Sequence, residues 1–414
     1  MDYLEIEGGS PLCGEVRIQG SKNAVLPILC AALQSPGVTV LENCPDISDV
    51  GAMLELLKGY GCRMRREGSR LVIDAGELHP GRASEAYAGT MRSSIMLLGS
   101  LLARFGEACL PYPGGCVIGE RPIDLHLQAL RQLGAELQEG PEGLRAVCAH
   151  PRGARICLPF PSVGATENVV LLAARAEGVT VLQNAAREPE IVELCRFLNC
   201  MGARIEGAGT GTIRIRGVER LHEARYRIMP DRIVAGTYML LSAAAGGKVI
   251  LKEVPLGQLR AVRQVLKQMG VRQESRGEEL CLWCPGRSRG GFAVCTSPYP
   301  GFPTDLQSPL MAALCLADGE SVIEERIFEA RFKTAEELAK MGADIRIQGA
   351  RAEICGVKKL LGCSLKAWEL RGGAALCIAA AAAEGTSRIF QYHYIARGYE
   401  NIIRDLKDMG VVVH

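Results

Sequence analysis

Apolar positions along the 414-residue chain follow a pattern that recurs six times. In each unit a helical periodicity ends at a glycine, and an alternation of apolar and polar residues follows, as in 343–347. A glycine just past a helix is typical of the left-handed residue that ends it, and the alternation is typical of a strand. The helical segments are 52–58, 125–132, 191–198, 259–268, 335–340 and 401–407, and their glycines, 68 to 73 residues apart, are Gly61, Gly134, Gly202, Gly270, Gly342 and Gly410.

A second glycine recurs 23 to 28 residues before the first in every unit. It ends an Ala/Leu-rich helix and begins a β-rich run such as 179–182, so each unit is predicted to be helix, strand, helix, strand. The period is longer than the 20–50 residues or so of solenoid repeats, which favours two closed globules of three units each. The second set of glycines is Gly37, Gly106, Gly178, Gly247, Gly319 and Gly385.

Composition narrows the class of protein. Lys plus Arg total 48 against 46 Asp plus Glu, a balance that argues against a general nucleic-acid binder. No apolar run approaches the 18 or so residues that span a membrane, and we expect no secretory signal at the N-terminus. The 17 cysteines are spread along the chain and His is rare, which indicates buried, reduced thiols in the cytoplasm.

The first turns of the Ala/Leu-rich helices carry polar residues that differ between units. Helix N-termini present free N–H groups and bind anions, so cations placed there predict a shared anion site. The alternative is ordinary capping by Ser, Thr and Asp beside solvated Arg, but four cations that oppose the helix dipole make this interpretation less favourable. The residues are Lys22, Arg92, Ser162, Arg232, Asp305 and Arg371.

A second variable position lies 9 to 12 residues beyond the inner glycine and is Asp49, Cys116, Arg187, Arg331 or Arg397. Cys116 lies in segment 113–122, whose three glycines and two prolines predict a loop of the kind that acts as a lid. A thiol there beside Arg121 favours the reactive thiolate, although an incidental loop cysteine is the alternative.

The residues alone therefore predict a protein of two globules that binds a polyanionic small molecule. Asp305 is the sole acid among the helix starts and so the candidate base. These arguments do not identify the reaction.

Seven segments strongly resemble UDP-N-acetylglucosamine 1-carboxyvinyltransferase, a family of bacterial enolpyruvyl transferases, and the resemblance extends from Tyr3 to Val413. They are long and stand in the family's order. The segments are 21–24 (SKNA), 113–126 (PGGCVIGERPIDLH), 162–168 (SVGATEN), 185–190 (AAREPE), 230–233 (PDRI), 302–305 (FPTD) and 397–400 (RGYE).

The resemblance implies an α/β fold of two inside-out α/β barrels built from six repeats. One barrel is expected to comprise 22–229, with the Cys loop, and the other 1–21 together with 230–414. The implied reaction transfers the enolpyruvyl group of phosphoenolpyruvate to the 3′-hydroxyl of UDP-N-acetylglucosamine and releases phosphate, the first committed step of peptidoglycan synthesis. The family implies a cytoplasmic monomer without metal or organic cofactor, and inhibition by fosfomycin.

The same resemblance assigns roles. Cys116 is the acid that protonates C3 of phosphoenolpyruvate, Asp305 the base for the sugar hydroxyl, and Lys22 a catalytic cation. Lys22, Arg92, Arg121, Arg371 and Arg397 hold phosphate and carboxylate, and Asn23 contacts the sugar or the intermediate. The nucleotide sugar is expected to contact Arg121, Pro122, Ile123, Asp124, Leu125, Ser162, Val163, Gly164, Asp305 and Ile327.

Four positions depart from the commonest family pattern: Phe160, Val234, Glu369 and Ala396. They leave open a catalytically weak paralogue that senses the nucleotide sugar. A further alternative is the enolpyruvyl transferase that acts on shikimate 3-phosphate, but the Cys-bearing loop and the segment 162–166 argue against it.

Overall fold

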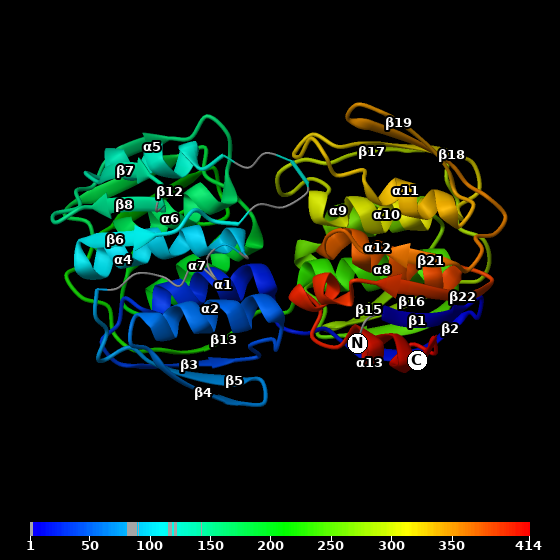
Figure 1. The fold of residues 1–414 in the computed structure, drawn as a ribbon, viewed down its shortest axis with the longest axis horizontal. Coiled ribbons are helices and arrows are strands. Elements are labelled where there is room, and N and C mark those ends of the chain that lie inside the picture. Colours follow the sequence, from blue (N-terminus) through cyan, green and yellow to red (C-terminus); the bar gives the residue numbers. More distant parts are fainter. Residues whose placement is uncertain (1–2, 81–88, 90, 115–117, 120–121, 142) are drawn as a thin grey trace. The chain divides into compact units, whose positions relative to one another are not determined.

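The computed structural model describes residues 3–80, 89, 91–114, 118–119, 122–141 and 143–414. The chain divides into two compact units. We call 20–115 with 121–229 the Lys22 unit, and 1–19, 116–120 with 230–414 the Asp305 unit. Figure 1 shows the helices and strands of both units. Each unit contains three sheets and one continuous hydrophobic core.

Five of the six sheets share one topology, which confirms the internal repeat. A parallel strand pair is extended by two antiparallel strands, which form a hairpin in four of these sheets and come from opposite ends of the chain in the fifth. In the Lys22 unit the sheets are β13(Arg225–Arg227)-β3(Val38–Glu42)-β5(Arg70–Asp74)-β4(Arg63–Glu67), β6(Glu107–Leu110)-β8(Gly143–Val147)-β7(Glu136–Gly140) and β11(Arg204–Glu206)-β12(Thr212–Arg216)-β10(Val179–Gln183)-β9(Arg155–Cys157).

The Asp305 unit repeats this arrangement. Its sheets are β21(Ser364–Lys366)-β22(Gly385–Phe390)-β1(Tyr3–Gly8)-β23(Val412–Val413), β15(Arg272–Arg276)-β16(Glu279–Cys284)-β14(Gly247–Lys252)-β2(Leu12–Arg17) and β17(Ala293–Cys295)-β18(Glu320–Glu324)-β20(Arg351–Cys355)-β19(Asp344–Gln348). The strands nearest the N-terminus, β1 and β2, pair with β22 and β14 and so complete the sheets of the last and the first repeat of this unit.

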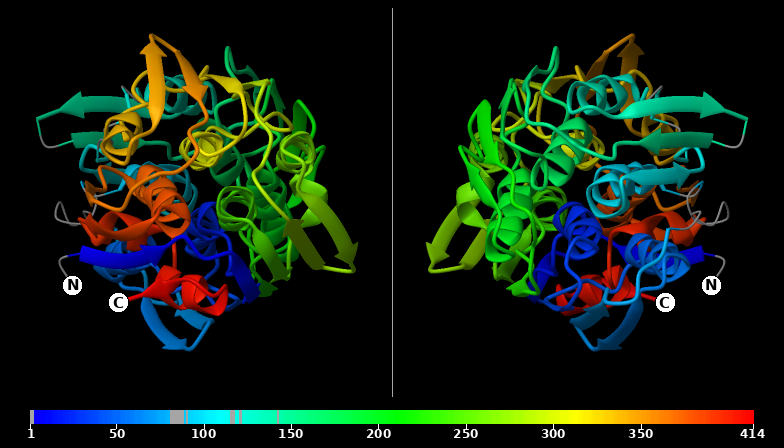
Figure 2. Two further views of the ribbon diagram at one scale, coloured as in Figure 1. Left: turned by 90° about the vertical axis from the view of Figure 1, so that its right-hand side faces the viewer. Right: turned by 90° about the vertical axis from the view of Figure 1, so that its left-hand side faces the viewer.

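Three inner helices fill the centre of each unit, and the sheets lie outside them (Figure 2). These helices are apolar on nearly every side and rich in small residues, so they can be buried all round and pack closely. They are α1(Lys22–Ala32), α4(Leu97–Phe105) and α6(Val163–Ala173) in the Lys22 unit, and α8(Arg232–Ala245), α10(Gln307–Leu314) and α12(Leu370–Ala382) in the Asp305 unit.

The second helix of each repeat is amphipathic and buries only one face. In α9(Arg260–Gln268) the buried residues are Val262, Val265 and Leu266, the i, i+3, i+4 spacing of a surface helix. The other five are α2(Ser48–Gly59), α5(Asp124–Gln132), α7(Pro189–Cys200), α11(Thr334–Lys340) and α13(Ile402–Asp408).

The glycines that define the repeat have the conformation expected of them. All six that follow the second helix have positive φ, between 83° and 98°, from Gly61 to Gly410. Of the inner set, Gly106, Gly178, Gly247, Gly319 and Gly385 also have positive φ, whereas Gly37 is absent from that group. The repeated helix ends read from the sequence are confirmed.

Two of the predicted helix starts are wrong in detail. Arg92 begins a 3-10 helix, Arg92–Met96, and α4 starts only at Leu97. Asp305 likewise lies in a 3-10 turn, Thr304–Leu306, that precedes α10. These two residues therefore do not occupy the first turn of an α-helix.

Candidate functional site

The first turn of α1 holds a buried ion pair. Lys22 Nζ lies 3.0 Å from Asp49 Oδ2, and the two side chains are only 14% and 6% exposed. Ser21 caps the helix, because its hydroxyl accepts a hydrogen bond from Ala24 N at 3.3 Å. Asp49, in the first turn of α2, was noticed in the sequence as a variable position but not as the partner of Lys22.

The first turn of α6 is fixed by its neighbours. Ser162 caps it by accepting from Ala165 N at 3.4 Å, and Val163 and Gly164 follow. A Cβ at Gly164 would lie 2.8 Å from the imidazole Cε1 of His126, so the close approach of the ring requires glycine there. His126 Nδ1 is 2.8 Å from Asn168 Nδ2, which gives this histidine a structural contact.

The remaining predicted residues of the Lys22 unit lie near helix starts. Asn23 is half-buried in α1, and Arg92 is half-buried at the start of its 3-10 helix. Pro122, Ile123, Asp124 and Leu125 lead into and begin α5, with Asp124 in its first turn. Cys116 and Arg121 lie outside the described residues.

In the Asp305 unit one carboxylate accepts hydrogen bonds from two arginines. Asp305 Oδ1 accepts from Arg331 Nη2 at 2.7 Å, and Asp305 Oδ2 accepts from Arg371 Nη2 at 2.9 Å. Both arginine side chains are almost fully buried, at 2% and 4% exposed, whereas Asp305 is 26% exposed. Neither ion pair was predicted from the sequence, in which Arg331 was noted only as a variable position.

Glu325 holds the loop after β18 against the turn that carries Asp305. Its carboxylate accepts from Thr304 Oγ1 at 2.9 Å, and also from the backbone N–H groups of Ile327 and Phe328 at 2.8 and 3.2 Å. Ile327, predicted to contact the nucleotide sugar, is thereby fixed through its main chain. Glu325 is 3% exposed, so this arrangement belongs to the interior.

Glu369 caps α12 and so positions Arg371. Its carboxylate accepts from Arg371 N at 2.7 Å and from Gly372 N. Burial disfavours the Arg371 cation, but Asp305, Tyr399 and Asp231 outweigh that cost and raise the pKa of Arg371 above its ordinary value. The departure from the family pattern at position 369 therefore still supplies a carboxylate cap at the helix start.

Asp231 caps α8 in the same way, since its Oδ1 accepts from Ile233 N at 2.7 Å and from Val234 N at 3.1 Å. The guanidinium of Arg232 lies over the ring of Tyr299, 5.6 Å from its centroid. Arg397 is half-buried and ends a 3-10 helix, Tyr392–Arg397. Arg232 and Arg371 therefore follow helix caps that carry a carboxylate, which offsets their charge at the positive end of the helix dipole.

The described cysteines are free, and 12 of the 16 are buried or partly buried. Burial raises the pKa of Cys62, Cys195, Cys315 and Cys377 to about 12, which makes these thiols unreactive. Most of the described cysteines are therefore buried or partly buried as expected, and the four exposed exceptions are Cys13, Cys157, Cys200 and Cys355.

One pair of cysteines has the C-x-x-C spacing of redox and metal motifs, Cys281 and Cys284 on β16. An odd spacing along a strand directs the two side chains to opposite faces, and accordingly Cys284 is buried whereas Cys281 is partly exposed. Across the described ranges we find no cluster of three or more His, Cys, Asp or Glu that could hold a metal ion. A helix long and apolar enough to cross a bilayer is also absent from these ranges.

Comparison with known proteins identifies the family. The family model for EPSP synthase (3-phosphoshikimate 1-carboxyvinyltransferase) matches residues 6–406. A UDP-N-acetylglucosamine 1-carboxyvinyltransferase of Nitratidesulfovibrio vulgaris is 46% identical over 412 residues, which cover 99% of this chain and 98% of the relative. The chain belongs to the UDP-N-acetylglucosamine 1-carboxyvinyltransferase family.

Other relatives agree with this family. UDP-N-acetylglucosamine 1-carboxyvinyltransferase 2 of Caldanaerobacter subterraneus subsp. tengcongensis is 45% identical over 410 residues, covering 99% of this chain and 98% of the relative. The enolpyruvyl transferase NikO from Streptomyces tendae superimposes with a TM-score of 0.89 at 25% identity, over 100% of this chain and 98% of NikO. The expected enolpyruvyl transferase fold and carboxyvinyl transferase activity are confirmed.

Proposed function

We propose that this enzyme transfers the enolpyruvyl group of phosphoenolpyruvate to the 3′-hydroxyl of UDP-N-acetylglucosamine, the step that commits the sugar to peptidoglycan. One observation carries the proposal. The chain is 45–46% identical, over almost its full length, to relatives whose names include this acceptor. The carboxylate held by two buried arginines in the Asp305 unit, and the partly buried Lys22 in the other unit, support it.

Asp305 is the proposed base. Its two oxygens accept guanidinium hydrogen bonds, and a carboxylate, with about four lone-pair positions, can accept from several donors at once, the sugar hydroxyl among them. Arg331 and Arg371 fix the orientation of the carboxylate, and its partial exposure gives the hydroxyl access. The proton of the 3′-hydroxyl passes to Asp305 as the hydroxyl oxygen forms its bond to C2 of phosphoenolpyruvate.

Cys116 is the proposed acid. It delivers a proton to C3 as C2 is attacked, which gives a tetrahedral ketal; loss of a C3 proton then expels phosphate and restores the double bond. The transferred group carries phosphate and carboxylate charge, which cations stabilise most effectively in a water-poor site. We assign this role to Lys22, Arg92, Arg121, Arg371 and Arg397, with Lys22 acting on the reacting centre.

The nucleotide sugar is proposed to bind along helix starts. Ser162, Val163 and Gly164 present the N-terminus of α6, whose N–H groups suit a diphosphate. Asp124 and Leu125 begin α5, and Ile327 is held by Glu325. The other proposed contacts are Asn23, Arg121, Pro122, Ile123 and Asp305.

A sugar-sensing paralogue with little turnover is the second candidate. The observation that favours it is Ala396, which departs from the acid that commonly precedes the arginine. The other notable departure does not support a loss of function, because Glu369 forms both cap hydrogen bonds.

Phosphate release tests the proposal. The enzyme with phosphoenolpyruvate and UDP-N-acetylglucosamine should release phosphate and yield a carboxyvinyl ether of the sugar, and shikimate 3-phosphate should not replace the acceptor. Turnover no better than buffer, combined with tight binding of the sugar, would establish the sensor instead. Turnover with shikimate 3-phosphate alone would refute the acceptor.

Labelling tests the thiol. Fosfomycin, a small anionic epoxide, should alkylate Cys116, and peptide mapping of wild type beside Cys116→Ser distinguishes it from the four exposed cysteines. A label that persists in Cys116→Ser would refute the assignment. We further propose a cytoplasmic monomer, and the 16 free cysteines are consistent with a reducing compartment.

A further inference from the structure

One sheet of the Lys22 unit presents arginines on its outer face. Along β9, β11 and β12, isoleucines point inward and are buried, and the residues between them point outward and are exposed. The outward positions include Arg155, Arg204, Arg214 and Arg216, with a single acid, Glu206. We call these four arginines the arginine face.

The register brings these charges together. Arg204 lies directly opposite Arg216, and Arg214 lies between Glu206 on one side and Val181 on the other. Val181 is in turn paired with Arg155. None of the four arginines has an acid within 4.0 Å among the residues that the structure describes.

The outer faces of other sheets pair at least some of their cations with acids. Arg65 pairs with Glu67 on β4 at 2.8 Å, and Arg351 pairs with Glu353 on β20 at 3.0 Å. The two sheets that contain β2 and β1 hold the ion pairs Lys252–Glu15 at 2.5 Å and Arg388–Glu5 at 2.6 Å. Strands β6, β7 and β8 carry one arginine and three glutamates. The arginine face, with four arginines against one acid, is therefore an exception in its charge balance.

Folding does not account for this exception. Like charges directly opposite each other on antiparallel strands destabilise a sheet, so the Arg204–Arg216 pair opposes the stability of its own fold. Residues that cost stability while remaining exposed are typical of binding surfaces.

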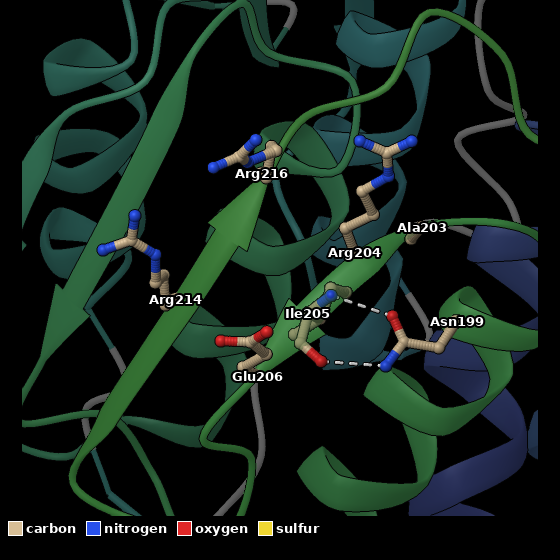
Figure 3. Close-up of a pocket in the computed structure, with 7 residues that line it drawn as sticks. All are labelled: Asn199, Ala203, Arg204, Ile205, Glu206, Arg214 and Arg216. Atoms are coloured by element: carbon tan, nitrogen blue, oxygen red, sulfur yellow. Dashed lines mark hydrogen bonds between the residues drawn. The ribbon is translucent and has the colours of Figure 1, made fainter.

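The face is hollowed where the arginines gather. A hollow of about 410 Å³ is lined by Asn199, Ala203, Arg204, Ile205, Glu206, Arg214 and Arg216 (Figure 3). The side chain of Asn199 on α7 donates to Ile205 O and accepts from Ile205 N, both at 2.9 Å. The edge of β11 is thus already hydrogen-bonded at Ile205, and a ligand must meet the face rather than add a strand there.

We propose that the arginine face docks an acidic, extended segment of a partner protein. Arg214 and Arg216 are two residues apart on one strand, a repeat of about 6.6 Å that matches carboxylates at alternate positions of an extended chain. Guanidinium groups bind carboxylates bidentately, and arginine is enriched in protein interfaces. The spread of the four charges over three strands suits a segment better than a single small anion.

Fluorescence anisotropy tests the proposal with the full-length enzyme. The probe is a fluorescein-labelled peptide of alternating Glu and Ser, and its counterpart has Gln in place of Glu. We expect the acidic peptide to bind at low ionic strength, the Gln peptide not to bind, and the affinity to fall with added salt. Replacing Arg204, Arg214 and Arg216 together by Gln should weaken binding at least about tenfold, since each loses a charge-assisted hydrogen bond.

A matched variant controls for net charge. Arg63→Gln, Arg65→Gln and Arg70→Gln remove the same charge from β4 and β5, where each arginine is ion-paired, and should leave affinity within about twofold. Equal losses in both variants, or no binding of the acidic peptide, would overturn the proposal. Pyrophosphate that binds the wild type but not the Arg204/Arg214/Arg216 variant, and displaces the peptide at equimolar concentration, would also overturn it in favour of a small anion.

Discussion

Inner helices α12 and α6 occupy corresponding places in their units, yet they keep buried charge in different ways. Arg371, in the first turn of α12, shares Asp305 with Arg331, so that two buried cations meet one partly exposed carboxylate. Glu167 on α6 is equally buried, but within the described ranges no cation lies at ion-pair distance from it. Burial is the main cause that raises the pKa of Glu167 well above its ordinary value. The negative charges of Glu190 and Glu188 raise it further.

The difference shows two solutions to one physical problem. A charge in the interior is either paired or neutralised by a change in protonation, because an isolated buried charge costs several kcal/mol. The Asp305 unit uses pairing, in which one carboxylate compensates two buried arginines. Glu167 in the Lys22 unit is stabilised in its protonated form, which makes the folding stability of the protein depend on pH. The arginine face is a third case, since its charges remain unpaired but hydrated.

The largest expected effect comes from removing the shared carboxylate. Asp305→Ala should lower turnover by roughly 10²–10⁴-fold, the usual contribution of a positioned proton-transfer group. It should also lower the free energy of unfolding by about 3 kcal/mol or more, because Arg331 and Arg371 lose a buried partner. In Asp305→Asn turnover should fall about as much as in Asp305→Ala, but the free energy of unfolding should fall less. Phosphate release and thermal unfolding of both variants give the two readouts, and near-normal turnover in either variant would reject the base assignment.

Arg331→Gln breaks one of the two hydrogen bonds to Asp305 and leaves the other. We expect the free energy of unfolding to fall by about 2 kcal/mol, the contribution of one hydrogen bond to a charged group. Turnover should fall more than substrate affinity, because the carboxylate is less firmly oriented. Steady-state kinetics that give kcat and KM separately, together with unfolding in urea, measure the two effects. A change in KM alone would mean that Arg331 contacts substrate instead.

Glu167→Gln tests neutralisation by protonation. Since the folded pKa of Glu167 is raised, the folded state binds the proton more tightly than the unfolded state, and wild-type stability falls as pH rises above the ordinary value of 4.5. This loss reaches at most about 1.4 kcal/mol per pH unit and stops above the folded pKa. The variant should lack this pH-dependent loss, so its free energy of unfolding should exceed that of wild type most at high pH. Urea unfolding of both proteins from pH 5 to 8 measures it, and parallel curves would contradict the comparison.

The smallest effect is expected at the arginine face. Arg204→Gln removes the repulsion from Arg216 and should raise the free energy of unfolding by about 0.2–1 kcal/mol at low salt. The gain should shrink with added salt as charges are screened. Thermal unfolding at two salt concentrations checks this, with Arg65→Gln as the ion-paired control that should gain nothing. A loss of stability in Arg204→Gln would show that the arginine supports the sheet.

Local physics was readable in the sequence. The glycines at the ends of the second helices have the positive φ that their position predicted, because only a residue without Cβ adopts that conformation at little cost. Ser21 and Ser162 cap the helices whose starts they marked. Resemblance of whole segments supplied the family, and the comparisons confirm it.

Contacts between distant segments were decided by the tertiary structure alone. Asp305 meets Arg331 and Arg371, 26 and 66 residues away, because a loop, a 3-10 turn and the start of α12 are packed together. β13 pairs with β3 across more than 180 residues and completes a sheet of the Lys22 unit. Pairings of this kind depend on how repeats close on one another, which no local pattern encodes, whereas helix ends and caps depend on neighbours within a few residues.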